Sequence, residues 1–276
     1  MTRIAELRVQ LVGYTTFVPP QIGEDEDGPV YWTGAHAANR IFEAKPNTLE
    51  FSPYPESAVP GRMQSLVEFA GRSCYESFDH PNPRTASNKG YLANTQEQGH
   101  GSIEEHASVS FYVTGVSRSL THELIRHRHL SYSELSQRFV NVETAAIVIP
   151  PLLADAVDID LYEDGAISPF EEVQQYSAAV YGGLVEGLTQ TNVPRKQVRE
   201  AARAVMANQT ETKIVVTGNL RAWKEFLIKR DSPHADAEIR RLAQEIGGQL
   251  AGIAPNIFGG SARAIWQDNE NQELPA

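Results

Sequence analysis

The sequence contains very little cysteine, since Cys74 is the one cysteine among 276 residues. A single thiol cannot form a disulfide within the chain, and it cannot supply the several thiolates of a cysteine-rich zinc site. We interpret Cys74 as a small buried side chain rather than a nucleophile. The sequence therefore excludes a disulfide-stabilised secreted scaffold and a zinc-finger type of domain.

Long apolar runs are also missing. No segment approaches the roughly eighteen consecutive apolar residues of a membrane-spanning helix. The first residues, MTRIAELRVQLVGYTTF, lack the apolar stretch behind a basic start that is typical of a secretion signal. We therefore expect a cytoplasmic protein that does not cross a membrane.

The sequence has fewer basic than acidic residues: 24 Lys and Arg against 35 Asp and Glu, which gives a formal net charge of -11. Affinity for nucleic acid depends on how many phosphates basic side chains neutralise, so this balance argues against a nucleic-acid-binding protein. Acidic residues gather at 23–28 and 155–165, beside Gly and Pro, and we expect exposed loops there.

The common catalytic motifs do not occur. The sequence has no Walker loop, no G-x-G-x-x-G fingerprint and no G-x-S-x-G elbow. The stretch HELIRH resembles the zinc motif H-E-x-x-H, but His122 and His127 are five residues apart and not four. That spacing does not place both imidazoles on one helical face, so we expect no metal site.

Hydrophobic periodicity predicts a mixture of helices and strands. The strands are expected at 7–15, 107–116 and 213–218, where apolar and polar residues alternate or β-branched residues cluster. Regular βαβ alternation is absent, so the fold class is α+β rather than a doubly wound sheet. With 41% hydrophobic residues the chain can bury a large core, and we expect a single domain over 1–276. Helical spacing is found at 64–75, 117–128, 170–188, 193–206, 220–230 and 232–253.

One short segment has the opposite charge to the rest of the chain. RHRHLSYSELSQR, at 126–138, holds three arginines, two histidines and three serines, and we expect a serine-rich loop after a helix that ends near Arg128. Arginine pairs with phosphate through a two-pronged guanidinium, so this segment can hold a small phosphorylated ligand. The alternative is a solvated surface on which these arginines, like Arg195, Arg199 and Arg203, pair with carboxylates.

The order of residues around this segment indicates a family. Arg126-His127-Arg128, seven further residues and Ser136 form a pattern similar to the signature of flavin-dependent thymidylate synthases. HGSIEEHASVSFYV precedes the pattern, and VPRKQVREAAR and TGNLRAWKEFLIKRDSPHADAEI follow it, in the order that such enzymes have them. The resemblance extends from the first strand to about residue 256, and it favours a binding site over a solvated surface.

The resemblance implies an activity and a set of ligands. Such enzymes make dTMP from dUMP, taking a one-carbon unit from 5,10-methylenetetrahydrofolate while FAD, reduced by NADPH, supplies a hydride. No enzyme cysteine attacks the uracil ring, so Cys74 keeps a structural role. The family also implies a mixed or antiparallel central sheet flanked by helices, and a homotetramer whose active sites are shared between subunits.

The resemblance also assigns residues to two overlapping groups of ligand contacts. The start of the predicted helix at 220–230 offers free backbone amides, which suit flavin phosphate or carbonyl oxygens. The FAD contacts are Ser102, Arg126, His127, Arg128, Glu134, Asn219, Leu220, Arg221 and Glu225. The dUMP contacts are Glu123, Leu124, Ile125, Arg126, Glu134, Leu135, Ser136, Gln137, Arg138, Arg199 and Arg230.

Arg230 corresponds to the catalytic arginine of the family. A guanidinium does not release its proton at neutral pH, so Arg230 cannot act as a base. Its implied role is to polarise the N3/O4 edge of uracil and to stabilise the negative charge that develops when hydride reaches C6. Ser136 is assigned to substrate binding, because no His or Lys in the motif is arranged to activate it as a nucleophile.

One position departs from the family pattern. Glu225 occurs where related sequences carry Asn or His, and a carboxylate beside flavin phosphates is unfavourable unless it is paired, for instance with Arg221 one helical turn away. This departure leaves open a non-catalytic nucleotide-binding protein that has lost flavin chemistry. A nucleic-acid-binding role for 126–138 is the third hypothesis, which the net charge disfavours.

Overall fold

The computed structural model describes residues 2–18, 20–26, 28–31, 62–78, 82–154 and 168–273. The chain forms two compact units, each described here by itself. Unit 1 comprises Met1–Val12, Ser110–Thr217 and Lys229–Gln244, and unit 2 comprises Gly13–Val109, Gly218–Ile228 and Glu245–Ala276. In the described part of the chain, no helix has both the length and the apolar character needed to span a membrane.

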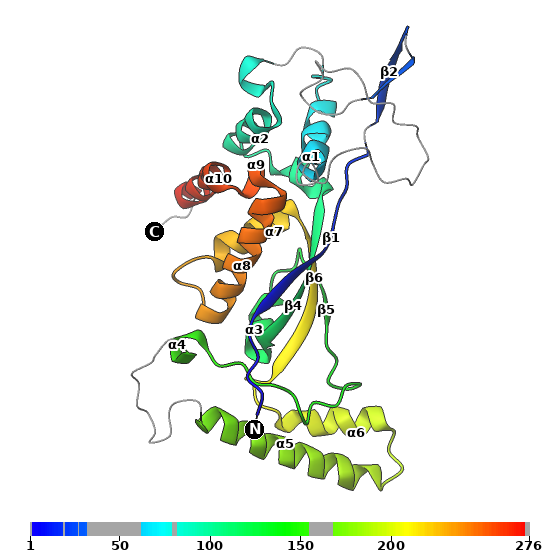
Figure 1. The fold of residues 1–276 in the computed structure, drawn as a ribbon, viewed down its shortest axis with the longest axis vertical. Helices are drawn as coiled ribbons and strands as arrows, with labels where there is room; N and C mark the ends of the chain where they lie inside the picture. Colours follow the sequence, from blue (N-terminus) through cyan, green and yellow to red (C-terminus); the bar gives the residue numbers. More distant parts are fainter. Residues whose placement is uncertain are drawn as a thin grey trace. The chain divides into compact units, whose positions relative to one another are not determined.

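Four strands pair into an antiparallel sheet, labelled in Figure 1. In β4 the predicted alternation is confirmed, because Val109, Phe111 and Val113 are buried between half-exposed neighbours. The helices that flank this sheet confirm the α+β class. The strand order is β1 (Arg8–Tyr14), β4 (Ser108–Ser117), β6 (Glu211–Asn219) and β5 (Ser131–Glu134).

The fourth strand, β5, corrects a prediction. Ser131–Glu134 belongs to the segment expected to be a loop, yet it pairs antiparallel with β6, with Tyr132 opposite Val216. The partner strand comes from a distant part of the sequence, so no local pattern indicates the pairing. The binding segment predicted at 126–138 therefore lies partly on an edge strand of the sheet.

The first acidic segment is also different from the prediction. Within 23–28 the described residues belong mostly to two paired antiparallel strands, β2 (Gln21–Asp25) and β3 (Gly28–Tyr31), rather than to an irregular loop. Glu24 and Glu26 are exposed there, as expected for solvated charge. The second acidic segment, 155–165, lies outside the described residues.

Unit 1 contains the helix that precedes the basic segment. Ser117 caps α3 (Arg118–Leu124) by accepting a hydrogen bond from the Leu120 amide at 3.0 Å, as the small hydroxyl residues predicted. The helix ends at Leu124, earlier than expected, and Arg126 to Arg128 follow in turns. Two further helices of this unit, α5 (Ser168–Thr189) and α6 (Arg195–Ala202), lie side by side in Figure 1. The unit also contains two short helices, α4 (Pro151–Ala154) and η4 (Arg203–Val205).

The ends of the last two helices were predicted with different accuracy. For α7 (Leu220–Arg230) both ends are confirmed, and the Asn219 side chain accepts a hydrogen bond from the Ala222 amide at 2.8 Å. For α8 (Ala237–Ile253) the predicted start at Ser232 is wrong, because Asp236 accepts a hydrogen bond from the Glu238 amide and caps the helix later. The predicted apolar stripe of α8 is buried: Ile239, Leu242, Ile246 and Leu250.

The core of unit 2 surrounds α7. Trp223 is fully buried, donates from Nε1 to the Val109 carbonyl at 3.1 Å and packs edge-on against Phe226. Cys74 was expected to be buried, but it is exposed, because it follows the last turn of α1. The other elements of this unit are α1 (Arg62–Ser73), η2 (Pro83–Thr85), α2 (Asn88–Glu97), η3 (Gly101–His106), α9 (Pro255–Phe258) and α10 (Gly260–Glu273).

Candidate active site

Arg230, the last residue of α7, is hydrogen-bonded to two residues of unit 1, one in α3 and one in the turn that follows α3. It donates from Nε to His127 Nε2 at 2.9 Å and from Nη1 to Glu123 Oε2 at 3.0 Å. The Arg230 side chain is 22% exposed, so it is held against the protein while part of the guanidinium faces outward. His127 Nε2 accepts this bond and therefore offers a lone pair rather than a proton. Arg230 thus contacts two residues assigned to the site that lie far from it in the sequence.

Tyr132 fixes the turn that carries this contact. Its hydroxyl lies 2.6 Å from the Leu124 carbonyl oxygen and 2.8 Å from the His127 carbonyl oxygen, and its one proton is shared between them. Burial raises the pKa of Tyr132 above its usual value, so the hydroxyl remains a donor at neutral pH. The same two carbonyl oxygens also accept backbone hydrogen bonds, from the His127 and Leu130 amides at 3.1 Å each, so the hydroxyl adds a side-chain contact to a turn that the backbone already closes. Sequence reasoning missed Tyr132, although it lies within the motif.

Glu134, at the end of β5, is hydrogen-bonded to two other residues of α3. Its Oε1 accepts hydrogen bonds from Arg118 Nη1 at 2.5 Å and from Thr121 Oγ1 at 3.1 Å. Neither Arg118 nor Thr121 was identified from the sequence. Their spacing of three residues on a helix was the available signal, since it places them on one face.

Arg199 meets the far end of the basic segment. It is buried, and its Nη1 donates to the Phe139 carbonyl oxygen, one residue beyond Arg138. The interpretation of a solvated arginine face is therefore wrong for Arg199, although Arg195 is exposed as expected. Arg230 and Arg199 thus reach the two ends of the segment 126–138, one at His127 and the other at Phe139.

The remaining residues assigned to dUMP lie along this segment with different exposure. Gln137 is buried, whereas Arg138 is half-exposed, with Nη1 3.9 Å from Glu200 Oε2. The side chain of Leu124 is fully buried in the core and that of Ile125 is exposed. Leu135 and Ser136 are half-buried, and Arg126 and Arg128 are exposed with their guanidinium groups available to a ligand.

The other residues assigned to FAD lie in unit 2, at the start of α7. Arg221 donates from Nη1 to Glu105 Oε1 at 2.6 Å, an ion pair that the sequence did not predict. The Arg221 side chain runs beside Gly101, since a Cβ built there would lie 3.6 Å from Arg221 Nε, and Ser102 is the exposed next residue. Glu225 is half-buried on the same helix. Exposed donors at Ser102 and Arg221 fit an anionic ligand such as the diphosphate of a dinucleotide.

The start of α7 offers fewer free amides than expected. The Leu220 amide donates to the Ala107 carbonyl at 2.9 Å, and the Ala222 amide is bonded to Asn219. The Leu220 side chain is fully buried. Below this turn, Lys224 donates to Glu104 Oε1 at 2.5 Å, and burial raises the pKa of Glu104 while Lys224 opposes the rise. Arg221 and Ser102, rather than a row of amides, are therefore the exposed donors here.

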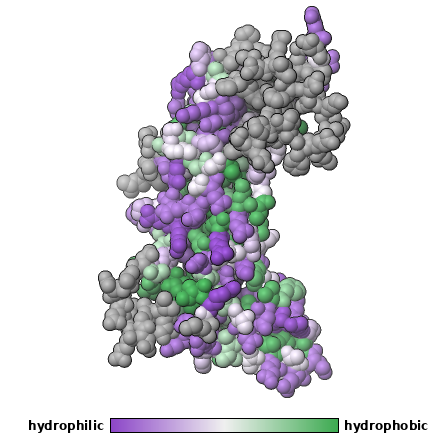
Figure 2. All heavy atoms as spheres, in the orientation of Figure 1, coloured by the Kyte–Doolittle hydropathy of each residue, from purple (hydrophilic) through white to green (hydrophobic). Residues whose placement is uncertain are grey.

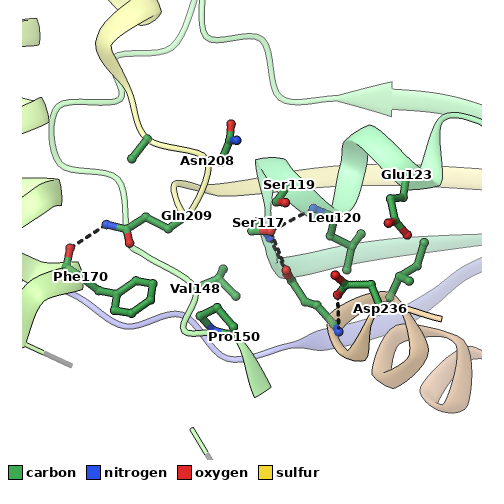
Figure 3. A pocket seen from close by; sticks show the side chains of 13 residues that line it. Ser117, Ser119, Leu120, Glu123, Val148, Pro150, Phe170, Asn208, Gln209 and Asp236 are labelled. Atoms are coloured by element: carbon green, nitrogen blue, oxygen red, sulfur yellow. Dashed lines mark hydrogen bonds between the residues drawn. The ribbon is translucent and has the colours of Figure 1, made fainter. Parts of the chain in front are cut away.

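A cavity of about 340 Å³ opens in unit 1 beside Glu123 (Figure 3). Ser117, the last residue of β4, and Glu123 of α3 line one side, Asp236 lies opposite, and Phe170 lies on a remaining wall. Ser117 donates from its amide and its hydroxyl to Glu238, at 2.8 and 2.6 Å, and burial raises the pKa of Glu238. The charged lining residues, Glu123, Asp236 and Glu238, are all carboxylates, so this cavity does not suit a phosphate.

Metal chemistry has no candidate site among the described residues. Within those ranges, no group of three or more His, Cys, Asp and Glu side chains is placed to hold an ion.

Comparison with known proteins identifies the family. The model of the thymidylate synthase complementing protein family matches residues 59–256. Proteins named flavin-dependent thymidylate synthase from Mycobacteroides abscessus and Mycobacterium tuberculosis are each 45% identical, over 269 and 263 residues, and one from Mycolicibacterium vanbaalenii is 46% identical over 266. Each match covers 94% of this chain and 91% of the relative. The chain therefore belongs to the family of flavin-dependent thymidylate synthases.

Proposed function

We propose that this chain converts dUMP to dTMP, with 5,10-methylenetetrahydrofolate as one-carbon donor, FAD as the flavin and NADPH as its reductant. One observation of the structure supports this assignment above the others. Arg230, from the end of α7, is bonded to Glu123 and His127, beside the Arg126-His127-Arg128 motif. A guanidinium held in this way is suited to a nucleotide and its developing charge.

Different arginines are assigned different roles in binding dUMP. Arg126 and Arg138 are exposed along the basic segment and can pair with the phosphate through charge-assisted hydrogen bonds. Ser136 and Gln137 add neutral donors between them. Arg199, buried and bonded to the Phe139 carbonyl, secures the end of the segment. The phosphate is thereby oriented as well as neutralised.

Arg230 is the residue that we assign to the uracil ring. Its Nε and Nη1 are engaged by His127 and Glu123, whereas Nη2 has no hydrogen-bond partner among the described residues. Because the guanidinium is planar, fixing two of its nitrogens fixes the direction of the third. Nη2 can donate to O4 of uracil and stabilise the negative charge that develops on the ring, with no proton transfer from the arginine.

The family resemblance assigns flavin contacts in each unit. In unit 1 they are Arg126, His127 and Arg128, and in unit 2 they are Ser102, Asn219 and Arg221; each set offers hydrogen-bond donors. When bound and reduced, the flavin supplies the hydride that completes the methyl group. Glu134 of unit 1 and Glu225 of unit 2 carry carboxylates, which suit N–H and O–H groups of the ligand rather than its phosphates.

Purified protein is expected to be yellow, to release FAD on denaturation and to liberate the C5 hydrogen of dUMP when methylenetetrahydrofolate and NADPH are supplied. Absorbance near the flavin bands and release of tritium from C5-labelled dUMP measure these two properties. Protein that binds dUMP, gains no flavin on addition of FAD and releases no tritium would support a non-catalytic nucleotide-binding protein. Binding only to long polymers, with steep salt dependence, would support nucleic-acid binding.

A homotetramer with shared active sites is part of this proposal, as is the union of the two units in one functional domain. On α5 of unit 1, Val173, Tyr176 and Leu184 are 50%, 75% and 38% exposed, while Gln174 and Ser177 are buried. These three apolar residues of α5 therefore face outward, whereas Tyr181 of the same helix is buried. Hydrophobic residues also appear at the surface over α4 in Figure 2, where Leu152 is 75% exposed. Exposed apolar stripes of this kind are typical of subunit interfaces.

The double substitution Val173→Glu/Tyr176→Glu is expected to convert a tetramer into smaller species, because it places two charges in the interface. Light scattering after size-exclusion chromatography measures the molar mass. Gln175→Glu, at an exposed position of the same helix, is the matched control and is expected to leave the mass unchanged. A monomeric wild-type protein, or a double variant that remains tetrameric, would contradict this role for α5.

A further inference from the structure

We propose that Arg118 is a positioning residue for the reaction, which acts through Glu134 and touches neither substrate nor cofactor. The inference rests on the proposed function, in which Glu134 contacts the bound nucleotide or flavin. Neither the family signature nor the sequence motifs include Arg118. Its assignment depends on the hydrogen bonds that α3 makes to β5.

The geometry places two donors of α3 on a single oxygen of Glu134. Arg118 Nη1 lies 2.5 Å and Thr121 Oγ1 lies 3.1 Å from Glu134 Oε1. The Thr121 hydroxyl also lies 3.1 Å from the Arg118 carbonyl, and its one proton favours the charged partner. Both bonds fall on Oε1, so they fix the rotation of the carboxyl group as well as its position.

Both ends of this contact are anchored. Ser117, directly before Arg118, caps α3 and is bonded twice to Glu238 of α8. Glu134 is the last residue of β5 and lies opposite Ile214 of β6. An ordinary surface ion pair contributes little because two mobile side chains must be ordered. Here the side chains are only 31% and 23% exposed and project from a capped helix and a paired strand, so little freedom remains to be lost.

The arrangement leaves one oxygen of Glu134 for a ligand. Glu134 Oε2 has no hydrogen-bond partner within the described part of the chain. A carboxylate oxygen accepts hydrogen bonds and repels phosphate, so Oε2 selects a sugar hydroxyl or a ring N–H. Arg118 therefore helps to set which side of the ligand faces β5: the donor-bearing sugar or ring, and not the phosphate.

Arg118→Met tests this role, because it keeps the length of the side chain and removes the charge and the donors. We expect kcat/KM for dUMP to fall about 10- to 100-fold, the scale of a misplaced binding group. The Kd for dUMP, read from the perturbation of the flavin absorbance, is expected to rise with it. Arg118→Lys restores a charged donor and is expected to recover most of the loss. Arg3→Met, which breaks the exposed Arg3–Glu211 pair in the same unit, is the matched control and is expected to behave as wild type.

A double-mutant cycle separates positioning from general damage. In the Glu134→Gln background, Arg118→Met is expected to have an effect below about twofold, because the residue through which it acts has already been changed. Additive effects, no recovery with lysine, or an Arg118→Met protein that matches the Arg3→Met control would each overturn the proposal. A wild-type protein that binds flavin and dUMP, together with an unaffected Arg118→Met variant, would refute the role of Arg118 alone. A wild-type protein that binds neither would refute the proposed function on which it rests.

Discussion

Replacing Arg230 with alanine is expected to lower kcat for dTMP formation by about 10²- to 10³-fold, the cost of losing one preorganised donor to a developing anion. Flavin content is expected to change little, because Arg230 is not among the residues assigned to the flavin and its free Nη2 is assigned to the uracil ring. Single-turnover measurement of dTMP and the flavin absorbance of the purified variant report the two quantities. The loss should therefore fall on chemistry and not on cofactor binding.

Two companion variants sharpen this test. Arg230→Lys keeps a positive charge but lacks the planar guanidinium that can bond His127, Glu123 and a ligand at the same time. Most of the loss of kcat is therefore expected to remain. Arg241→Ala, at an exposed arginine of α8, is the control for removing a guanidinium and is expected to retain full activity. If Arg230→Ala turned over at a rate within about threefold of wild type, the role given to Arg230 would be wrong.

Arg72→Met is expected to reduce stability by about 3–5 kcal/mol, the largest effect on folding that we predict. The Arg72 and Glu68 side chains on α1 are 3% and 0% exposed, with Nε 2.7 Å from Oε1. Arg72 also donates to the carbonyl oxygens of Ser77 and Thr85 and lies over the ring of Tyr91. Removing the guanidinium leaves a buried carboxylate and two carbonyls without this partner, and that desolvation cost explains the magnitude.

Urea unfolding followed by circular dichroism, with hydrogen exchange to locate the change in α1, measures this loss. Arg84→Met breaks the exposed Arg84–Glu97 pair of the same unit and is expected to cost less than about 1 kcal/mol. Arg72→Met/Glu68→Leu is expected to be more stable than Arg72→Met alone, because no buried charge remains. A single variant as stable as the Arg84→Met control would contradict this account of the pair.

Local pattern predicts those elements whose environment repeats along the chain. Val109, Phe111 and Val113 alternate because one face of β4 is buried, and Asn219 marks the start of α7 because its side chain can cap the helix. The start of α8 was placed too early because Ser232 and Pro233 imitate a helix start, whereas Asp236 makes the observed capping bond. The strand β5 was missed because its partner is remote in sequence.

The residues of the candidate site were likewise predicted only in part from the sequence. The motif and its resemblance assigned Glu123, His127 and Arg230, and the structure places these three in contact. Arg118, Tyr132 and Glu105 were missed because each acts through a partner that no periodicity or short motif indicates. The burial of Arg199 was equally invisible, since its spacing with Arg195 and Arg203 is also that of a solvated helix face.

The pairing of β5 with β6 has a consequence for how the protein is made. Ribosomes synthesise Ser131 well before Thr217, its partner across the two strands, and at about 5–20 residues per second the delay is on the order of several seconds. During that time the motif has left the ribosome without the strand that shapes it. A nascent chain released before β6 is made therefore lacks a formed nucleotide-binding segment, however complete its signature appears.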